Sequence, residues 1–245
     1  MADLVLTIRG RYGRVLDAIS EAARKGGRDA DTIRLVVVTK MQPVATVRAA
    51  IEAGAQILGE NYAEEAADKI AVLGQQSGVE WHMIGHVQSR KAGLVAQHFD
   101  LIHSLDSIRL AERLNRSAAE AERSLPVLLE FNVSGETSKH GWTAADETHW
   151  AELLPDVKAV AALTNLKVRG LMTMPPLSTD PEVGRRYFQQ LRHLRDFLME
   201  RVPQAEWHEL SMGTSADFAV AVEEGATLVR VGQAILGPRP TVEEI

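Results

Sequence analysis

Lys40 is the residue whose type and position most directly suggest chemistry in this 245-residue chain. It ends the β-branched run 34–40, a pattern typical of a buried strand. An amine at the mouth of such a strand can be desolvated, and the neutral amine that this favours attacks carbonyl groups. The alternative is an ordinary strand-end lysine whose amine extends into water. Which of the two holds depends on what the fold brings near Lys40.

Two loops rich in small residues could bind an anion near the C-terminus. Segment 211–215 (Ser-Met-Gly-Thr-Ser) precedes a helical pattern that runs to about Gly225, and segment 230–233 (Arg-Val-Gly-Gln) opens a second, short one. Backbone N–H groups at helix starts bind anions, and the helix dipole favours negative charge there. The alternative is ordinary N-capping by Ser215 beside a tight glycine turn. Taken together, the two loops favour a phosphate ester as the ligand.

A lysine, a phosphate site and an arginine together suggest pyridoxal 5'-phosphate (PLP). Its aldehyde would form a Schiff base with Lys40, and Arg230 would face its pyridine nitrogen. An arginine at that position keeps the nitrogen unprotonated and weakens the ring as an electron sink. The residues expected to hold the phosphate are Ser211, Gly213, Thr214, Ser215, Gly232 and Gln233.

The elements that must position these residues alternate regularly along the chain. Eight strand-like segments are each followed by a helical pattern, which implies parallel pairing and an α/β fold, the (β/α)₈ barrel. A doubly wound open sheet is the competing fold, but no Gly-x-Gly-x-x-Gly follows the first strand. The expected strands are 34–40, 57–60, 80–85, 101–105, 126–133, 167–173, 206–211 and 227–231.

We expect an extra helix before the barrel and a single domain over residues 1–245. Asp3 could cap that first helix, and Gly26-Gly27 would end it. A later helix is expected to open near Pro181 and to stop at Pro203. No linker or low-complexity segment divides the chain, and 134–142 is expected to be a long loop. Active sites of such barrels lie at the C-terminal ends of the strands, where Lys40 and Arg230 fall.

Composition excludes several classes of protein. The 27 basic and 33 acidic residues are well mixed and give a net charge of −6, so nucleic acid is not an expected partner. Cysteine is absent, which removes disulfides and thiolate sites from consideration. No run reaches transmembrane length and no leader pattern opens the chain, so we expect a cytoplasmic protein without membrane contact. The histidines show no ligand spacing, because His82 and His86 on one strand would stand roughly 13 Å apart, and no metal site is expected.

Seven short motifs, spread over residues 38–232, are specific when they occur together. They are Val38-Thr39-Lys40 with Pro43, Leu58-Gly-Glu-Asn-Tyr62, Trp81-His-Met-Ile-Gly85, Val87-Gln-Ser-x-Lys91, Arg169-Gly-Leu-Met172, Leu210-Ser-Met-Gly213 and Val229-Arg-Val-Gly232. In these motifs the chain resembles the YggS/PROSC family of pyridoxal phosphate homeostasis proteins. Members of that family are barrels similar to the N-terminal domain of alanine racemase.

The resemblance implies a fold-type III PLP-binding TIM barrel in which Lys40 carries the cofactor and Arg230 faces its pyridine nitrogen. It adds Asn61 beside the cofactor and Met172 as a wall of the pocket. The sequence departs from the family pattern at three places. His86-Val87 replaces a common Pro-Leu pair, Arg90 replaces an asparagine, and Thr214 replaces a methionine and could donate its hydroxyl to the phosphate.

The implied function is to hold PLP and to buffer or deliver it in vitamin B6 and amino-acid homeostasis, with apo PLP-dependent enzymes as partners. Catalysis is not expected, because racemases of this fold use a second acid/base, which the resemblance places on a tyrosine of an additional domain. The tyrosines here are Tyr12, Tyr62 and Tyr187, of which Tyr62 stays a candidate. The alternatives are a PLP-dependent amino-acid racemase and a lyase that acts on phosphorylated sugars through Lys40. Without the additional domain's dimer contacts, a monomer is expected.

Overall fold

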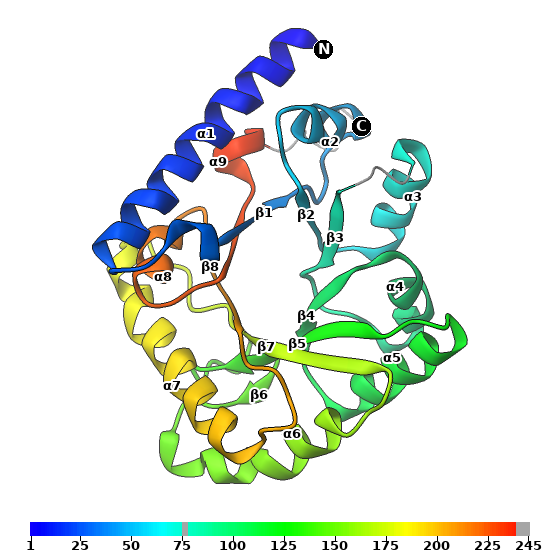
Figure 1. Cartoon of the computed structure of the whole chain (residues 1–245), viewed down its shortest axis with the longest axis vertical. Helices are drawn as coiled ribbons and strands as arrows, with labels where there is room; N and C mark the ends of the chain where they lie inside the picture. Colours follow the sequence, from blue (N-terminus) through cyan, green and yellow to red (C-terminus); the bar gives the residue numbers. More distant parts are fainter. Residues whose placement is uncertain (75–77, 239–245) are drawn as a thin grey trace.

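Parallel strands close into a barrel in the computed structural model, which describes residues 1–74 and 78–238 (Figure 1). The hydrogen-bonding order is β1-β2-β3-β4-β5-β7-β8-β9, and β9 pairs with β1 to complete the ring. β6 lies outside the ring and pairs with the end of β5. The strands are β1 Arg34–Val38, β2 Ile57–Glu60, β3 Glu80–Met83, β4 Leu101–Leu105, β5 Leu125–Asn132, β6 Trp142–Thr143, β7 Leu166–Met172, β8 Glu209–Thr214 and β9 Leu228–Val231.

Helices surround this ring on the outside (Figure 1). They are α1 Ala2–Lys25, α2 Val44–Glu52, α3 Ala63–Leu73, α4 Ala92–His98, α5 Ile108–Glu120, α6 Leu154–Ala161, α7 Arg185–Arg201, α8 Phe218–Glu223 and α9 Gln233–Leu236. Short 3₁₀ turns lie at Ala30–Thr32, Ser89–Lys91, Glu147–Leu153 and Pro181–Gly184. Within residues 1–74 and 78–238, none of these helices combines the length and the apolar composition that a bilayer crossing requires.

The predicted (β/α)₈ barrel and its N-terminal helix are confirmed, with one strand displaced. The seventh predicted strand, 206–211, is observed three residues later as β8, because pairing continues through the segment that its small residues had suggested was a loop. Ser211 pairs with Met172 on one side, and Thr214 pairs with Arg230 on the other, across a bulge. The predicted loop 134–142 ends one residue early, since Trp142 begins β6.

Helix ends followed the predicted signals with two corrections. Met1 is the N-cap of α1, so Asp3 is not the cap but lies in the first turn, where its carboxylate complements the helix dipole. Gly27, at φ +65°, ends the helix as expected. Pro181 opens a 3₁₀ turn rather than α7 itself, which begins at Arg185 and ends before Pro203.

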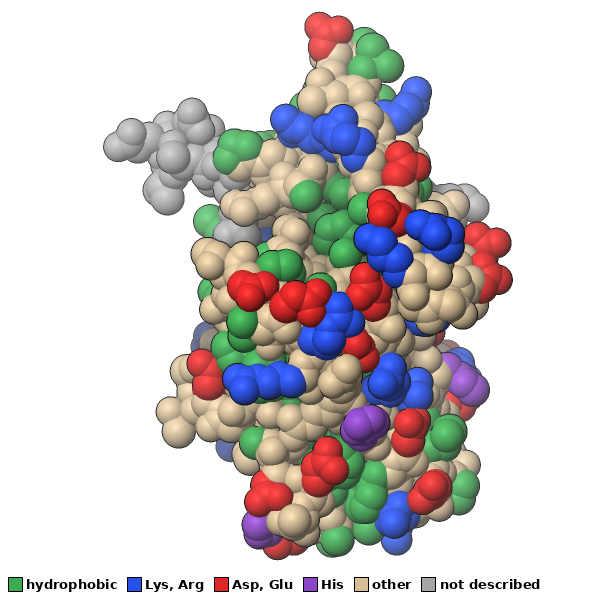
Figure 2. Space-filling model, turned by 90° about the vertical axis from the view of Figure 1, so that its left-hand side faces the viewer, with side chains coloured by type: hydrophobic (Ala, Val, Ile, Leu, Met, Phe, Trp, Pro, Cys, Tyr) green, Lys and Arg blue, Asp and Glu red, His purple; other side chains and the backbone are tan. Residues whose placement is uncertain are grey.

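The main apolar core fills the shell between the strands and the helices. α1 buries Val5, Ile8, Val15 and Ile19 at helical spacing and packs against α8, α9 and α2 (Figure 1). The outer face on that side of the molecule shows acidic and basic side chains interspersed (Figure 2). Because the two signs are mixed there, this face has none of the basic character of a nucleic-acid surface.

The barrel interior has its own small apolar layer, made by Val36, Ile57, Leu101, Leu128, Met172 and Leu228. An ion cluster lies at the N-terminal ends of the strands. There Arg34 Nη2 stands 2.7 Å from Glu209 Oε1, and Arg34 Nη1 stands 3.7 Å from Glu80 Oε2. The interior therefore contains an apolar layer and is charged at this end.

A chain of hydrogen bonds runs beside the apolar layer through the barrel. His82 Nε2 lies 3.0 Å from Glu80 Oε2, and His82 Nδ1 lies 3.0 Å from His103 Nε2. His103 Nδ1 lies 2.7 Å from Ser211 Oγ, which also accepts a hydrogen bond from Arg230 Nη1. The two histidines and Ser211 are fully buried, so the chain connects a carboxylate at one end of the barrel to a guanidinium at the other without water.

The two ends of this chain fix the direction of every hydrogen bond in it. A guanidinium can only donate and a carboxylate can only accept. Ser211 accepts from Arg230, so its own proton points to His103 Nδ1. His103 then donates from Nε2 to His82 Nδ1, and His82 donates from Nε2 to Glu80. Burial lowers the pKa of His82, and that of His103 well below its ordinary value, which keeps both rings neutral.

We expect both His82 and His103 to be neutral Nε2–H tautomers at neutral pH, as read from the ¹⁵N chemical shifts of their ring nitrogens. Because their folded-state pKa values are lowered, the stability that the neutral pair contributes is present above about pH 6.5 and is lost as the pH falls below it. Unfolding by urea between about pH 5 and pH 8 measures that loss. An Nδ1–H tautomer at either ring, or imidazolium at about pH 6, would contradict the assigned direction.

Candidate functional site

A cavity of about 520 Å³ opens at the C-terminal ends of the barrel strands. In (β/α)₈ barrels this is the end that carries active sites, and its volume lies in the range of roughly 300–1,000 Å³ that suits a small organic ligand. The polar and charged side chains that line it are Lys40, Asn61, His86, Glu130, Ser138, Lys139, His140, Thr214, Ser215, Arg230 and Gln233.

Within the described part of the chain, the structure brings eight of the ten predicted site residues to this cavity. They are Lys40, Asn61, Met172, Thr214, Ser215, Arg230, Gly232 and Gln233. Ser211 and Gly213 are not among the residues that line it. Ser211 is fully buried in the barrel interior, where its hydroxyl bonds to His103 and Arg230. Ser211 therefore contacts the predicted site through Arg230.

The segment that carries Lys40 is held by a buried ion pair. Lys69 on α3 donates to the Thr39 carbonyl at 2.7 Å and to Glu60 Oε1 at 2.7 Å, and Glu60 is fully buried. Thr39 Oγ1 donates to the same Glu60 oxygen at 2.7 Å. The backbone immediately before Lys40 is thus fixed to β2 and α3, while Lys40 itself extends into the cavity.

The residue after Lys40 adopts a strained conformation. Met41 has φ +59°, in the left-handed region, which for a residue other than glycine costs roughly 1–2 kcal/mol. Its N–H donates to Glu65 Oε1 at 2.6 Å, and the same oxygen also accepts a hydrogen bond from Lys69 Nζ at 2.6 Å. The sharp turn is therefore held by the same group of side chains as Thr39.

The loops after β8 and β9 meet on the part of the cavity wall next to Lys40, because β9 pairs with β1. Gly213 has φ +90°, and a Cβ there would lie 2.5 Å from the Cβ of Ala221, so glycine is required where β8 turns against α8. The Gly232 N–H donates to Ser215 Oγ at 3.3 Å and joins the two loops. Thr214 donates both its N–H and its hydroxyl to Asp217 Oδ1, at 2.7 and 3.0 Å. The Thr214 hydroxyl therefore already has an acceptor other than a ligand.

Asn61 presents an unsatisfied acceptor beside the cavity. Its Oδ1 is buried and has no hydrogen-bond partner among the described residues. The asparagine is pressed against Gly85, where a Cβ would lie 2.5 Å from the Asn61 carbonyl oxygen. An unpaired buried acceptor is costly, and a ligand that donates a hydrogen bond here would remove that cost.

Two buried ionisable groups of opposite sign line the cavity. Burial lowers the pKa of Arg230 to about 10, with Glu130 and Asp217 opposing the shift, so the guanidinium remains charged at neutral pH. Burial raises the pKa of Glu130 to about 7, and the Asp106 charge adds to that effect, whereas Arg230 and Lys139 oppose it. Glu130 therefore changes protonation near physiological pH inside the cavity.

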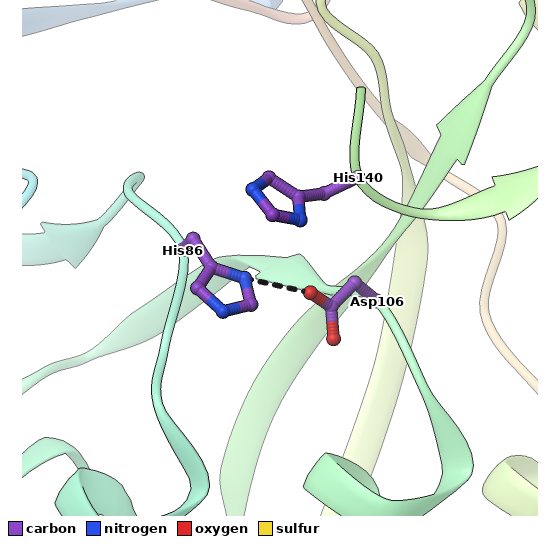
Figure 3. Close-up of side chains that lie close together, drawn as sticks. All are labelled: His86, Asp106 and His140. Atoms are coloured by element: carbon purple, nitrogen blue, oxygen red, sulfur yellow. Dashed lines mark hydrogen bonds and ion pairs between the residues drawn. The ribbon is translucent and has the colours of Figure 1, made fainter. Parts of the chain in front are cut away.

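A cluster at the rim joins side chains that the sequence analysis treated separately (Figure 3). His86 Nδ1 lies 2.8 Å from Asp106 Oδ2, and the His86 and His140 rings are stacked with centroids 4.2 Å apart. Lys139 is half-buried, lines the cavity and donates to the Pro175 carbonyl at 3.4 Å. Spacing along the chain gave no sign of this proximity.

Arg90, one of the departures noted in the sequence, lies away from the cavity. Its Nε donates to Gln88 Oε1 at 2.9 Å, and it lines a neighbouring cleft with Tyr62 and Lys91. Lys91 pairs with Glu64 in that cleft. The cavity walls therefore do not include Arg90.

Sequence reasoning missed Lys69 and the interior histidines. Lys69 sits on a helix pattern rich in charge, and nothing in that pattern distinguishes it from its exposed neighbours. His82 and His103 offered a clearer signal, because a histidine in the middle of an otherwise apolar strand must have a partner inside the barrel. Because β3 and β4 are neighbours in the ring, a histidine on each of them would have predicted the contact between His82 and His103.

Comparison with known proteins identifies relatives over almost the whole chain. Residues 15–240 match the family described as alanine racemase, N-terminal domain. A protein named pyridoxal phosphate homeostasis protein from Vibrio alginolyticus is 39% identical over 236 residues, which are 95% of this chain and 98% of the relative. A protein of the same name from Pseudomonas aeruginosa is 40% identical over 233 residues, 95% of this chain and 96% of the relative.

Solved structures share the fold. The structure of PipY from Synechococcus elongatus with PLP bound has a TM-score of 0.77 and 37% identity, and the match covers 89% of this chain and all of PipY. An alanine racemase from Streptomyces lavendulae has a TM-score of 0.68 at 19% identity over 98% of this chain and 59% of the racemase. At that identity the racemase shows the fold alone.

Replacing Lys69 by methionine is expected to destabilise the protein by about 3–5 kcal/mol, because it leaves the buried Glu60 carboxylate without its partner. Urea unfolding measures the loss. The double variant Lys69→Met/Glu60→Gln removes the unpaired charge, so it should regain most of the stability that Lys69→Met loses. Lys158→Met, at an exposed lysine, is the control. A loss no larger than that of the control would show that the ion pair does not hold the Lys40 segment.

Replacing Glu130 by glutamine is expected to stabilise the protein at alkaline pH. Because the folded-state pKa of Glu130 is raised, its favourable contribution is complete below about pH 4.5 and is lost as the pH rises through about 7. The variant should be more stable than the parent by up to about 3 kcal/mol at pH 8 and little different at pH 4.5. Urea midpoints across that range provide the measurement, with Glu152→Gln, at an exposed carboxylate, as control. Parallel curves for parent and Glu130→Gln would contradict the assignment.

Proposed function

Because the chain belongs to the alanine racemase N-terminal-domain family, and within it to the pyridoxal phosphate homeostasis proteins, we propose that it binds PLP in the cavity at the C-terminal end of the barrel. It would hold the cofactor through Lys40 and buffer or deliver it in vitamin B6 and amino-acid homeostasis. Apo PLP-dependent enzymes are the proposed recipients, and the protein would act as a monomer formed by one domain.

The observation that carries the proposal is that Lys40, Arg230 and the 214–215 and 232–233 segments line one cavity. A phosphorylated pyridine aldehyde needs an amine, a partner for its ring nitrogen and a phosphate site. The cavity offers all three, and the cationic side chains of Lys40, Lys139 and Arg230 suit an anionic ligand. The unsatisfied Asn61 Oδ1 adds a place for a ligand donor.

When bound, PLP supplies an electrophilic aldehyde and an electron-withdrawing ring. Lys40 would supply the amine, and the fixed Thr39–Met41 backbone would limit where that amine can reach. Arg230 can only donate, so it would hold the ring nitrogen unprotonated. Its guanidinium is charged and is oriented by Ser211 and by the Thr173 carbonyl at 2.9 Å.

The phosphate would lie against the joined loops that follow β8 and β9. Ser215, Gly232 and Gln233 line the cavity there, and Ser215 already accepts the Gly232 N–H, which leaves its hydroxyl proton to donate. Thr214 would form part of the cavity wall but would not donate to the phosphate, because its hydroxyl proton is directed to Asp217. Ser211 and Gly213 would act by building the wall, Ser211 through Arg230 and Gly213 through the turn.

The cavity favours a holder over a racemase. None of the residues 12, 62 and 187, the three tyrosines of the chain, lies among the described residues that line it. A one-base exchange of an amino-acid α-proton remains the chemical alternative. It would be detected by deuterium incorporation from D₂O into added L-alanine.

The decisive experiment measures the visible absorption of protein incubated with PLP and then desalted. The parent protein should retain a yellow, protein-bound cofactor, and Lys40→Ala should lose it. Lys139→Ala, which removes the other lysine of the cavity, should retain the absorption. Retention by Lys40→Ala together with loss by Lys139→Ala would move the attachment point to Lys139. Absence of colour in all three proteins would overturn the proposed cofactor.

The same samples separate holding from catalysis. A loaded parent that transfers its cofactor to an apo PLP-dependent aminotransferase, and that leaves L-alanine unexchanged in D₂O, fits the proposal. Deuterium exchange into L-alanine that depends on Lys40 would favour the racemase hypothesis over the proposed holder.

A further inference from the structure

Three metal-ligating side chains from separate segments converge at the rim of the cavity (Figure 3). His86 follows β3, Asp106 follows β4, and His140 belongs to the segment between β5 and β6. One potential ligand atom from each lies within 4.8 Å of the others. We propose that His86, Asp106 and His140 bind a divalent first-row transition ion of the Zn²⁺ type.

The distances require only a small rearrangement. Zn–N and Zn–O bonds of roughly 2.0–2.2 Å at tetrahedral angles place two ligand atoms roughly 3.4 Å apart. His86 Nδ1 and Asp106 Oδ2 already stand 2.8 Å apart, so most of the adjustment falls on His140. Its side chain is exposed and lies in an irregular segment, where neighbouring atoms restrict a change of rotamer least.

The ligand set selects the class of ion. Two imidazoles and one carboxylate suit zinc and its neighbours, whereas magnesium and calcium prefer oxygen ligands throughout. Three protein ligands leave at least one position for water or a ligand group. The chain contains no cysteine, so no thiolate site competes for the ion.

The surroundings support the carboxylate ligand and add negative charge. Ser107 Oγ donates to Asp106 Oδ1 at 3.0 Å, which orients the carboxyl group and leaves Oδ2 toward the histidines. Asp106 also repels Glu130, whose protonation it favours, and a bound cation would relieve that repulsion. Lys139, next to His140, opposes the ion and limits its affinity.

The test uses the full chain with any affinity tag removed, titrated with Co²⁺ and followed by visible absorption. We expect saturation at one ion per chain and displacement by Zn²⁺, with equilibrium dialysis giving the same stoichiometry for Zn²⁺. His86→Ala, His140→Ala and Asp106→Asn should each weaken binding by at least about tenfold, because each removes one of three ligands. Binding should weaken as the pH falls, because the ligands must be deprotonated.

His149→Ala is the matched control. His149 is exposed and, like His86, has an aspartate beside it, Asp146 at 3.2 Å, but it lies outside the triad. Its replacement should leave Co²⁺ binding unchanged. Absence of saturable binding, or equal weakening by the triad variants and by His149→Ala, would overturn the proposal. Because neither readout involves PLP, the outcome is independent of the proposed cofactor function.

Discussion

The buried guanidinium of Arg230 is the group on which the interior of the barrel depends. A charge withdrawn from water must be surrounded by acceptors or compensating charge. Ser211 Oγ and the Thr173 carbonyl accept from it directly, and Glu130 and Asp217 compensate part of its charge. Ser211 then needs an acceptor for its own proton, which His103 supplies, and His103 in turn needs His82 and Glu80. Polar residues occupy positions that apolar side chains would otherwise fill, because one cation stands at the floor of the cavity.

The wall that carries Lys40 follows a different physical rule. There the Lys40 side chain extends from a fixed backbone. That backbone is held by Lys69, Glu60 and Glu65, none of which is among the described residues that line the cavity. The left-handed Met41 is tolerated because Glu65 accepts its N–H. The cavity therefore presents an immobile, oriented cation on β9 and, just past the neighbouring strand β1, a long side chain on a rigid base. That combination suits a ligand that must be captured in one orientation and later released.

Periodicity and strand-end chemistry predicted the barrel and its N-terminal helix, and eight of the ten predicted site residues line the cavity. Lys40 and Arg230 could be found because they end β-branched runs, where (β/α)₈ barrels place their sites. The displacement of β8 could not be predicted, because Ser-Met-Gly-Thr has the composition of a loop and is a strand only through pairing with β7 and β9. Lys69 and the His86–His140 contact depend on segments far apart in sequence, and no local pattern encodes that proximity. The departure from the family pattern at His86 drew attention to one residue of the rim cluster, but it did not indicate that Asp106 and His140 lie beside it.

The single direction of the interior hydrogen bonds constrains any attempt to re-engineer this barrel into a catalyst. Exchanging Arg230 for a carboxylate, which would protonate the ring nitrogen of a bound pyridine, puts an acceptor at both ends of the chain. Ser211, His103 and His82 would then have to reverse, and His82 would turn a lone pair toward Glu80. The conflict disappears only if a buried imidazole becomes charged or if Glu80 is replaced by a donor. The electronic character of the cavity is thus set jointly by residues at opposite ends of the barrel, and it must be redesigned at both.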